Sequence, residues 1–244
     1  VALDAKDKMA WSYLGAAYMG QHRTDEAIAA YKKQIDVDPY REYAYTNLGR
    51  AYAAKGSTAD AEAAFLKQLE INPLDRYAYT NLGTLYIDSH AYEKAAAAYE
   101  KAVAIAPDEA SLQVDLGKAY VHLKNVDKAR EAFARAVELS PTPDTWNNVA
   151  YQLALAGLDL DRTQQYAESA VSSAAAASRN LDVERADAAA FGVVRSLAAD
   201  WDTLGWVYFA RGDLKNAERF VAPAWKLSEH AEVGDHLGQI FEKL

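Results

Sequence analysis

Side chains that could perform chemistry are few and scattered in this chain of 244 residues. It has no cysteine, which excludes disulfides and thiolate metal sites, and its five histidines lack the spacing of a metal site. One constellation pairs carboxylates with an imidazole. Asp202 and Asp235 take the same position in the first helices of two adjacent predicted helix pairs, and His236 follows Asp235. Such a group could act as an acid–base pair or as a polar clamp for a ligand. The alternative is a hydrogen bond that fixes the last helix, so we predict no catalytic residue, no metal site and no cofactor.

These residues must be positioned by a chain that repeats itself. The stretch YAYTNLG occurs at 43–49 and again at 77–83, one step of 34 residues later. This period is the length of one helix–turn–helix unit in a stacked solenoid. Alanine is abundant, whereas only six prolines and twelve glycines occur. That composition is typical of an all-helical protein.

Four consecutive repeats keep nearly the same signature residues in register. In the second repeat these are Tyr45, Leu48, Gly49, Tyr52, Ala61, Phe65 and Pro73. They resemble the tetratricopeptide repeat (TPR), in which W-x2-L-G-x2-Y is followed by A-x3-F and then P. The first residues form one helical stripe, Gly and Ala allow two helices to approach closely, and Pro ends the second helix. The resemblance implies an all-α fold, a right-handed superhelical solenoid of TPR helix–turn–helix units.

The chain is predicted to form a single TPR solenoid over residues 1–244. The predicted repeats are 8–41, 42–75, 76–109, 110–142, 143–178 and 198–230, followed by a terminal helix at 231–244. Because residues 1–4 match the end of a second helix, we expect the chain to begin inside a repeat and to be a fragment of a longer protein.

Two stretches depart from the repeat. The repeat at 143–178 carries five extra residues, 158–162, which should lengthen its turn. Residues 179–197 form an inserted segment with a rough helical stripe, and Gly192 is expected to break it. The segment either packs as a short helix over the edge of the superhelix or folds into the concave groove and reshapes the binding site.

The composition argues against nucleic-acid and membrane partners. The formal net charge is −9, and no face is dense in lysine or arginine, so phosphate groups would be repelled. No run approaches the roughly 18 apolar residues of a membrane span. We therefore predict a protein or peptide partner, no nucleic-acid partner and no insertion into a membrane. The oligomeric state stays open.

By resemblance to the family, six positions of each first helix line a concave groove that binds ligands. At these positions Tyr43 recurs with Asn47 and, one repeat later, Tyr77 with Asn81. An Asn amide matches the C=O and N–H of an extended peptide, and Tyr is a rigid apolar plate with a polar tip. The predicted peptide-binding residues are Tyr13, Tyr43, Asn47, Arg50, Tyr77, Asn81, Asp115, Lys118, Asn148, Tyr151 and Trp206. The alternative is that the Tyr and Asn pairs only join neighbouring repeats after a recent duplication.

The predicted function is a non-catalytic protein–protein interaction scaffold that binds an extended peptide or partner segment in the groove. Compared with TPR domains that hold a peptide C-terminal carboxylate, this chain keeps Asn47 and Asn81 but lacks most of the cations, so that clamp is not expected. Two alternatives are a structural, self-associating spacer and an accessory module of a larger enzyme. Residues 201–214 and 230–243 weakly resemble TPR regions of bacterial envelope proteins with transglutaminase-like domains. That resemblance implies an upstream catalytic domain and a periplasmic or cell-envelope location, with the cytoplasm still open.

Overall fold

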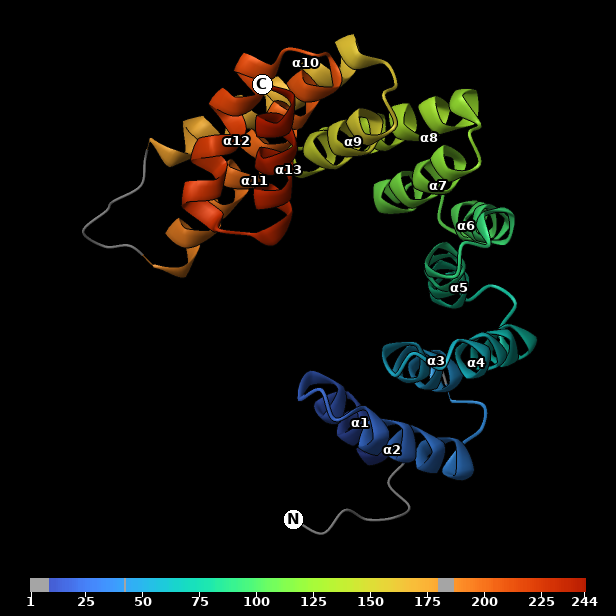
Figure 1. The fold of residues 1–244 in the computed structure, drawn as a ribbon. Helices are drawn as coiled ribbons and strands as arrows, with labels where there is room; N and C mark the ends of the chain where they lie inside the picture. The colour runs from blue at the N-terminus through green and yellow to red at the C-terminus, as the bar shows by residue number, and fades with distance from the viewer. Residues whose placement is uncertain (1–8, 42, 180–186) are drawn as a thin grey trace. The chain divides into compact units, whose positions relative to one another are not determined.

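A computed structural model of the chain describes residues 9–41, 43–179 and 187–244. Over these residues it has thirteen α-helices and no β-strand, so the predicted all-α class is confirmed. The contacts group the chain into two compact units, an N-terminal unit of residues 1–123 and a C-terminal unit of residues 124–244 (Figure 1).

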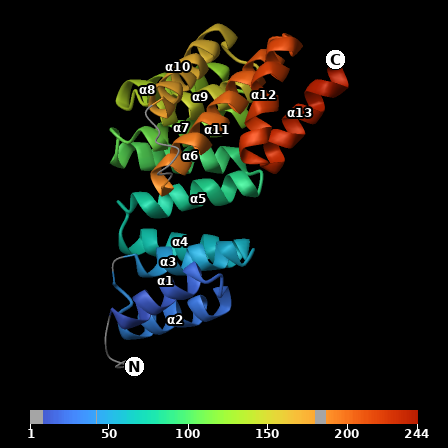
Figure 2. The same ribbon diagram turned by 90° about the vertical axis from the view of Figure 1, so that its left-hand side faces the viewer.

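The N-terminal unit is built from helices joined by short turns. Its helices are α1 (Ala10–Gly20), α2 (Thr24–Val37), α3 (Ala44–Ala54), α4 (Thr58–Ile71), α5 (Arg76–Asp88), α6 (Tyr92–Ile105) and α7 (Ala110–His122). Residues 55–57 and 89–91 are the turns within two of the pairs. Figure 2 shows the pairs α1/α2, α3/α4 and α5/α6 following one another along this unit. This is the stacking of helix–turn–helix pairs that the 34-residue period predicts.

Small residues let the two helices of a pair approach closely, as the sequence predicts. A Cβ atom on Gly49 would lie 2.5 Å from the ring of Phe65, and one on Gly83 would lie 2.6 Å from the ring of Tyr99. Ala61, on the second helix of the α3/α4 pair, has no exposed surface. A larger side chain at these crossings would push the helices apart, at a cost of about 1–3 kcal/mol.

The C-terminal unit contains the longer helices. They are α8 (Val126–Leu139), α9 (Pro143–Leu155), α10 (Leu160–Ser178), α11 (Ala188–Ala210), α12 (Leu214–Ser228) and α13 (Ala231–Lys243). One apolar cluster joins α9, α10 and α11, and a second joins α11, α12 and α13. In the second cluster Ile240 of α13 has no exposed surface. The last helix therefore covers apolar surface of α11 and α12.

The irregular stretches differ in detail from the sequence-based expectations. The turn before α10 is residues 156–159, one residue more than the turns at 55–57 and 89–91, and the other extra residues form the first turn of α10. The expected break at Gly192 is wrong, because α11 continues through it. One glycine costs a helix only about 1 kcal/mol relative to alanine, and residues 188–190 are all Ala. Residues 188–197 thus extend α11, while 180–186 lie outside the described residues.

Candidate peptide-binding groove and a second pocket

Two helices of the N-terminal unit, α3 and α5, line a groove of about 510 Å³. Its lining residues are Tyr43, Thr46, Asn47, Arg50, Tyr77 and Asn81. Residues four apart share one face of a helix, which brings Tyr43 to the side of Asn47, and Tyr77 to the side of Asn81. Five of the predicted peptide-binding residues therefore lie around one groove.

The sixth lining residue, Thr46, was not predicted from the sequence. Thr46 Oγ1 donates to Oδ2 of Asp75 at 3.3 Å, and Oδ1 of Asp75 accepts from the backbone N–H groups of Tyr77 and Ala78 at 3.0 and 3.1 Å. Asp75 is only 3% exposed. This carboxylate caps the N-terminus of α5 and also holds α3. It therefore links the two walls of the groove.

Tyr43 and Tyr77 form an aromatic surface at the N-terminal ends of α3 and α5. Their rings meet edge to face with 5.5 Å between centroids. The guanidinium of Arg76 lies 4.1 Å from the centre of the Tyr77 ring and donates to its hydroxyl at 2.7 Å. Tyr77 is still 44% exposed. The ring is thus held in place while nearly half of the residue's surface stays exposed.

Tyr43 itself has a left-handed backbone conformation, with φ of 61° at the residue before α3. A residue other than glycine in this region costs about 1–3 kcal/mol, and such strain is common at binding sites. The contact between Tyr43 and Tyr77 joins two neighbouring repeats, which is the structural role that the sequence left as an alternative.

The two asparagines do not bond a neighbouring repeat. Asn81 Nδ2 donates to the backbone oxygen of Tyr77 in its own helix at 2.6 Å, which leaves its Oδ1 as an acceptor. Among the described residues the side chain of Asn47 has no hydrogen bond, and Arg50 has no ion pair. The groove therefore presents donors and an acceptor that are available to a ligand.

Three other predicted residues of this unit lie outside the groove. Tyr13 stands on α1 and is 65% exposed. On α7, Lys118 Nζ lies 3.3 Å from Asp115 Oδ1. Burial raises the pKa of Asp115, and the neighbouring Lys118 opposes that shift. Asp115 and Lys118 thus form an ion pair with each other.

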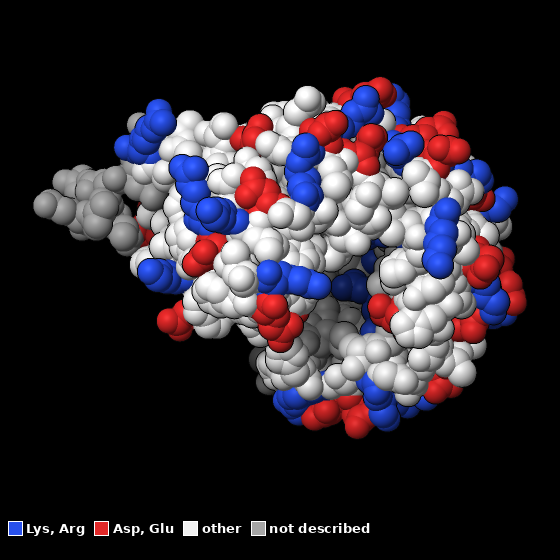
Figure 3. Space-filling model, turned by 45° about the horizontal axis from the view of Figure 1, so that its top comes forward, with Lys and Arg blue, Asp and Glu red and all other residues white. Residues whose placement is uncertain are grey.

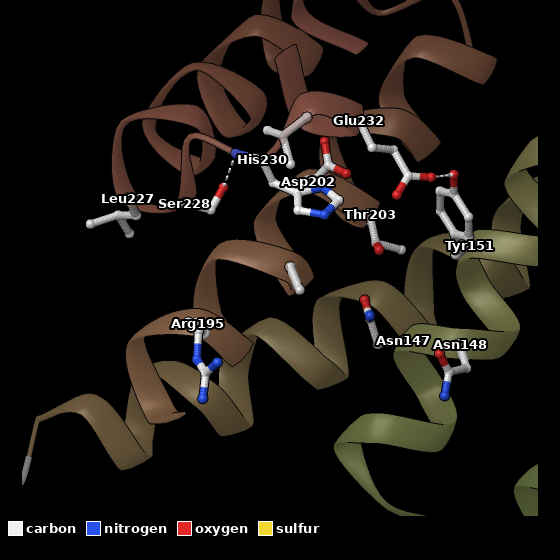
Figure 4. A pocket seen from close by; sticks show the side chains of 12 residues that line it. Asn147, Asn148, Tyr151, Arg195, Asp202, Thr203, Leu227, Ser228, His230 and Glu232 are labelled. Carbon is white, nitrogen blue, oxygen red and sulfur yellow. Dashed lines mark hydrogen bonds between the residues drawn. The ribbon is translucent and has the colours of Figure 1, made fainter. Parts of the chain in front are cut away.

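A second pocket, of about 480 Å³, lies in the C-terminal unit between α9, α11 and the junction of α12 with α13 (Figure 4). The predicted residues Asn148 and Tyr151 line it, and the hydroxyl of Tyr151 donates to Glu232 on α13. Asp202, which the sequence suggested for a polar clamp, lines it too, whereas sequence reasoning missed Asn147, Arg195 and Glu232. Arg195 belongs to the inserted segment, which has no repeat register, and Glu232 lies on the terminal helix three residues before Asp235.

Asp202 and His236 form a buried pair beside this pocket. His236 Nδ1 lies 2.9 Å from Oδ1 of Asp202, and the two residues are 4% and 7% exposed. The contact joins α11 to α13, which is the structural alternative for this constellation. Asp235 is exposed and accepts a hydrogen bond from Gln239 instead.

Trp206 is wrong as a peptide-binding residue. It is 9% exposed, and its ring stacks on His236 at 4.1 Å and on Phe209 at 4.6 Å between centroids. Its position in the repeat predicts a groove residue, but His236 of the terminal helix α13 covers the ring. A peptide has no access to this indole.

The described residues offer little for other chemistry. No three of their His, Asp or Glu side chains are placed to hold a metal ion. In the same part of the chain, every helix is too short or too polar to cross a membrane. On the face in Figure 3, basic and acidic side chains are interspersed rather than gathered by sign.

Two family models, both described as tetratricopeptide repeat, match residues 18–82 and 82–154. The chain belongs to the tetratricopeptide repeat family. The weaker resemblance of residues 201–214 and 230–243 to envelope proteins lies outside both matches and stays a prediction. No curated protein matches this TPR chain.

Solved structures of TPR proteins share the fold. PilW, a type IV pilus biogenesis factor, has 19% identity and a TM-score of 0.71 over 98% of this chain and 100% of its own. Pseudomonas aeruginosa pilF has 16% identity and a TM-score of 0.68 over 99% and 98%. YrrB, described as a TPR protein with an unusual peptide-binding site, has 20% identity and a TM-score of 0.54 over 86% and 98%. These likenesses support the TPR solenoid fold, which is consistent with a protein-interaction scaffold.

Proposed function

We propose that this TPR chain is a non-catalytic scaffold that binds an extended segment of a partner protein in the groove between α3 and α5. The supporting observation is the joint lining of that groove by Tyr43, Asn47, Arg50, Tyr77 and Asn81.

The groove matches the chemistry of an extended backbone. Such a backbone exposes alternating C=O and N–H groups, and the amide of Asn47 with the Oδ1 of Asn81 supplies both kinds of partner. The edge-to-face pair of Tyr43 and Tyr77 offers aromatic surface to an apolar side chain, and aromatic anchors lose little conformational entropy on binding. Arg50 adds a cation, so a peptide with an acidic residue at that point is favoured.

Two further facts are consistent with this role. The groove is held by the buried Thr46–Asp75 hydrogen bond, and a site that is already formed costs less to order on binding. The solved TPR protein YrrB has a peptide-binding site, which makes the same kind of ligand reasonable here.

The test begins with peptides selected on the immobilised full chain from a display library, followed by calorimetry of the best one. Replacing Asn47 and Asn81 together by Ala should weaken its binding by about tenfold or more, because two lost hydrogen bonds are worth roughly 1–3 kcal/mol. Gln165→Ala, an exposed amide on α10, is the control and should leave the affinity unchanged. Equal affinity of the double variant would refute the groove. Sedimentation over a range of concentrations separates the scaffold from a self-associating spacer.

A further inference from the structure

Part of the lining of the pocket in the C-terminal unit is apolar. Leu227, Ala199, Val233 and the ring of Tyr151 belong to this part. Leu227 is 46% exposed at the end of α12, unlike the buried leucines of the core. Covering an exposed leucine with apolar atoms is favourable. The pocket therefore favours a ligand with an apolar portion.

The polar residues of the pocket supply several hydrogen-bond acceptors. Asp202 is held from behind by His236, and Glu232 by the hydroxyl of Tyr151. Asn147 Oδ1 is buried and has no hydrogen-bond partner among the described residues. A buried oxygen without a partner destabilises the protein, and an N–H group of a ligand that bonded it would remove that cost. Figure 4 shows Asp202 and Glu232 across the cavity from Asn147.

The charged groups next to Tyr151 are negative. Burial, the hydrogen bond to Glu232, and the charges of Glu232 and Asp202 all raise the pKa of Tyr151. Arg195 also lines the pocket, but it precedes Asp202 by seven residues on α11, which is about 10 Å along the helix axis. In Figure 4 it lies apart from the Tyr151–Glu232 pair. His230 is the other titratable group of the lining and belongs to the α12–α13 junction.

We propose that this pocket binds a positively charged side chain, a lysine or an arginine, of a partner protein. Its charged end lies among Asp202, Glu232 and Asn147, which accept its hydrogen bonds. Its methylene stem lies against the ring of Tyr151. Lysine and arginine share this chemistry of a cation on an apolar stem. The pocket has no residue in common with the groove of the N-terminal unit, so this proposal stands or falls independently of the proposed function.

The test is a titration of the full chain, followed by NMR, with three small compounds: the N-acetyl N-methylamides of lysine, arginine and norleucine. Norleucine has an apolar stem like that of lysine and no charge. We expect saturable shifts at the amides of Tyr151 and Glu232 with lysine or arginine, and affinity at least about tenfold weaker for norleucine. The tighter of the two cations identifies the preferred residue. Norleucine binding as well as lysine, or the absence of a saturable shift, would overturn the proposal.

Two variants separate the pocket from the general attraction of an acidic protein. Glu232→Gln removes one negative charge inside the pocket and keeps an oxygen that can accept from Tyr151. Asp235→Asn removes the same charge three residues later on α13, outside the lining. We expect Glu232→Gln to weaken lysine binding about fivefold and Asp235→Asn to have little effect. Equal effects of the two variants would contradict the proposal.

Discussion

The groove between α3 and α5 consists largely of residues that recur after 34 positions, whereas the pocket of the C-terminal unit does so only in part, since Asn148 takes the repeat position of Asn47 and Asn81 but Arg195 of the inserted segment has no counterpart. Tyr43 and Asn47 return as Tyr77 and Asn81. The pocket instead combines a side chain of the inserted segment with side chains of the terminal helix. A repeated surface suits a repeated ligand such as a peptide backbone, and an irregular pocket suits one particular side chain.

The two regions also differ in electrostatic character, and a buried carboxylate of the C-terminal unit gives the largest expected effect. Burial, together with the nearby charge of Asp144, raises the pKa of Asp200 to about 7. Between about pH 4 and pH 7 the folded protein keeps a proton on Asp200 that the unfolded chain has released. The free energy of unfolding of this unit should therefore fall by roughly 3–4 kcal/mol as the pH rises through that range, and then level off.

Tryptophan fluorescence reports mainly on the C-terminal unit, because four of the five tryptophans belong to it and only Trp11 lies in the N-terminal unit. Urea titrations at several pH values should show the decrease, and Asp200→Asn should remove it. A slope that persists in Asp200→Asn would show that another group is responsible.

The second comparison concerns two capping carboxylates, one in each unit. Asp75→Ala removes the cap of α5 and leaves the hydroxyl of Thr46 buried without its acceptor, so we expect a loss of roughly 2 kcal/mol and of peptide binding in the groove. Asp213→Ala removes the cap of α12, whose Oδ1 accepts from the N–H of Asn216 at 3.2 Å. Calorimetric titrations should show the groove affected by the first variant only. Equal loss of peptide binding in both would contradict the role of Asp75.

The smallest expected effect is on salt dependence. Binding of the lysine compound in the pocket should weaken about two- to fivefold between 0.05 and 0.5 M NaCl, because salt screens partly exposed charges. Binding of an uncharged peptide in the groove should change less. Calorimetry at both salt concentrations measures the difference, and an equal response of the two sites would remove this distinction between them.

Repetition explains how much the sequence alone could predict. The doubled YAYTNLG separates into Leu48 and Gly49, which pack, and Tyr43 and Asn47, which line the groove, and the resemblance to the TPR family predicted that division. Contacts between distant helices were not visible. Trp206 is covered by His236, and Thr46 bonds Asp75 on the next helix pair, because tertiary packing decides both. The pocket was predicted only in part, through Asn148 and Tyr151, because Arg195 lies in the inserted segment and follows no repeat.

The hydrogen bonds of Asp75 connect the opening of the groove to two backbone amides of α5. The carboxylate that bonds Thr46 through Oδ2 also holds the amides of Tyr77 and Ala78 through Oδ1, so opening the groove frees the carboxylate from α3 and should loosen its hold on these two amides. Their rates of hydrogen exchange should therefore report how often the two walls separate. A ligand that bridges α3 and α5 would slow both rates together, even before its own contacts are known.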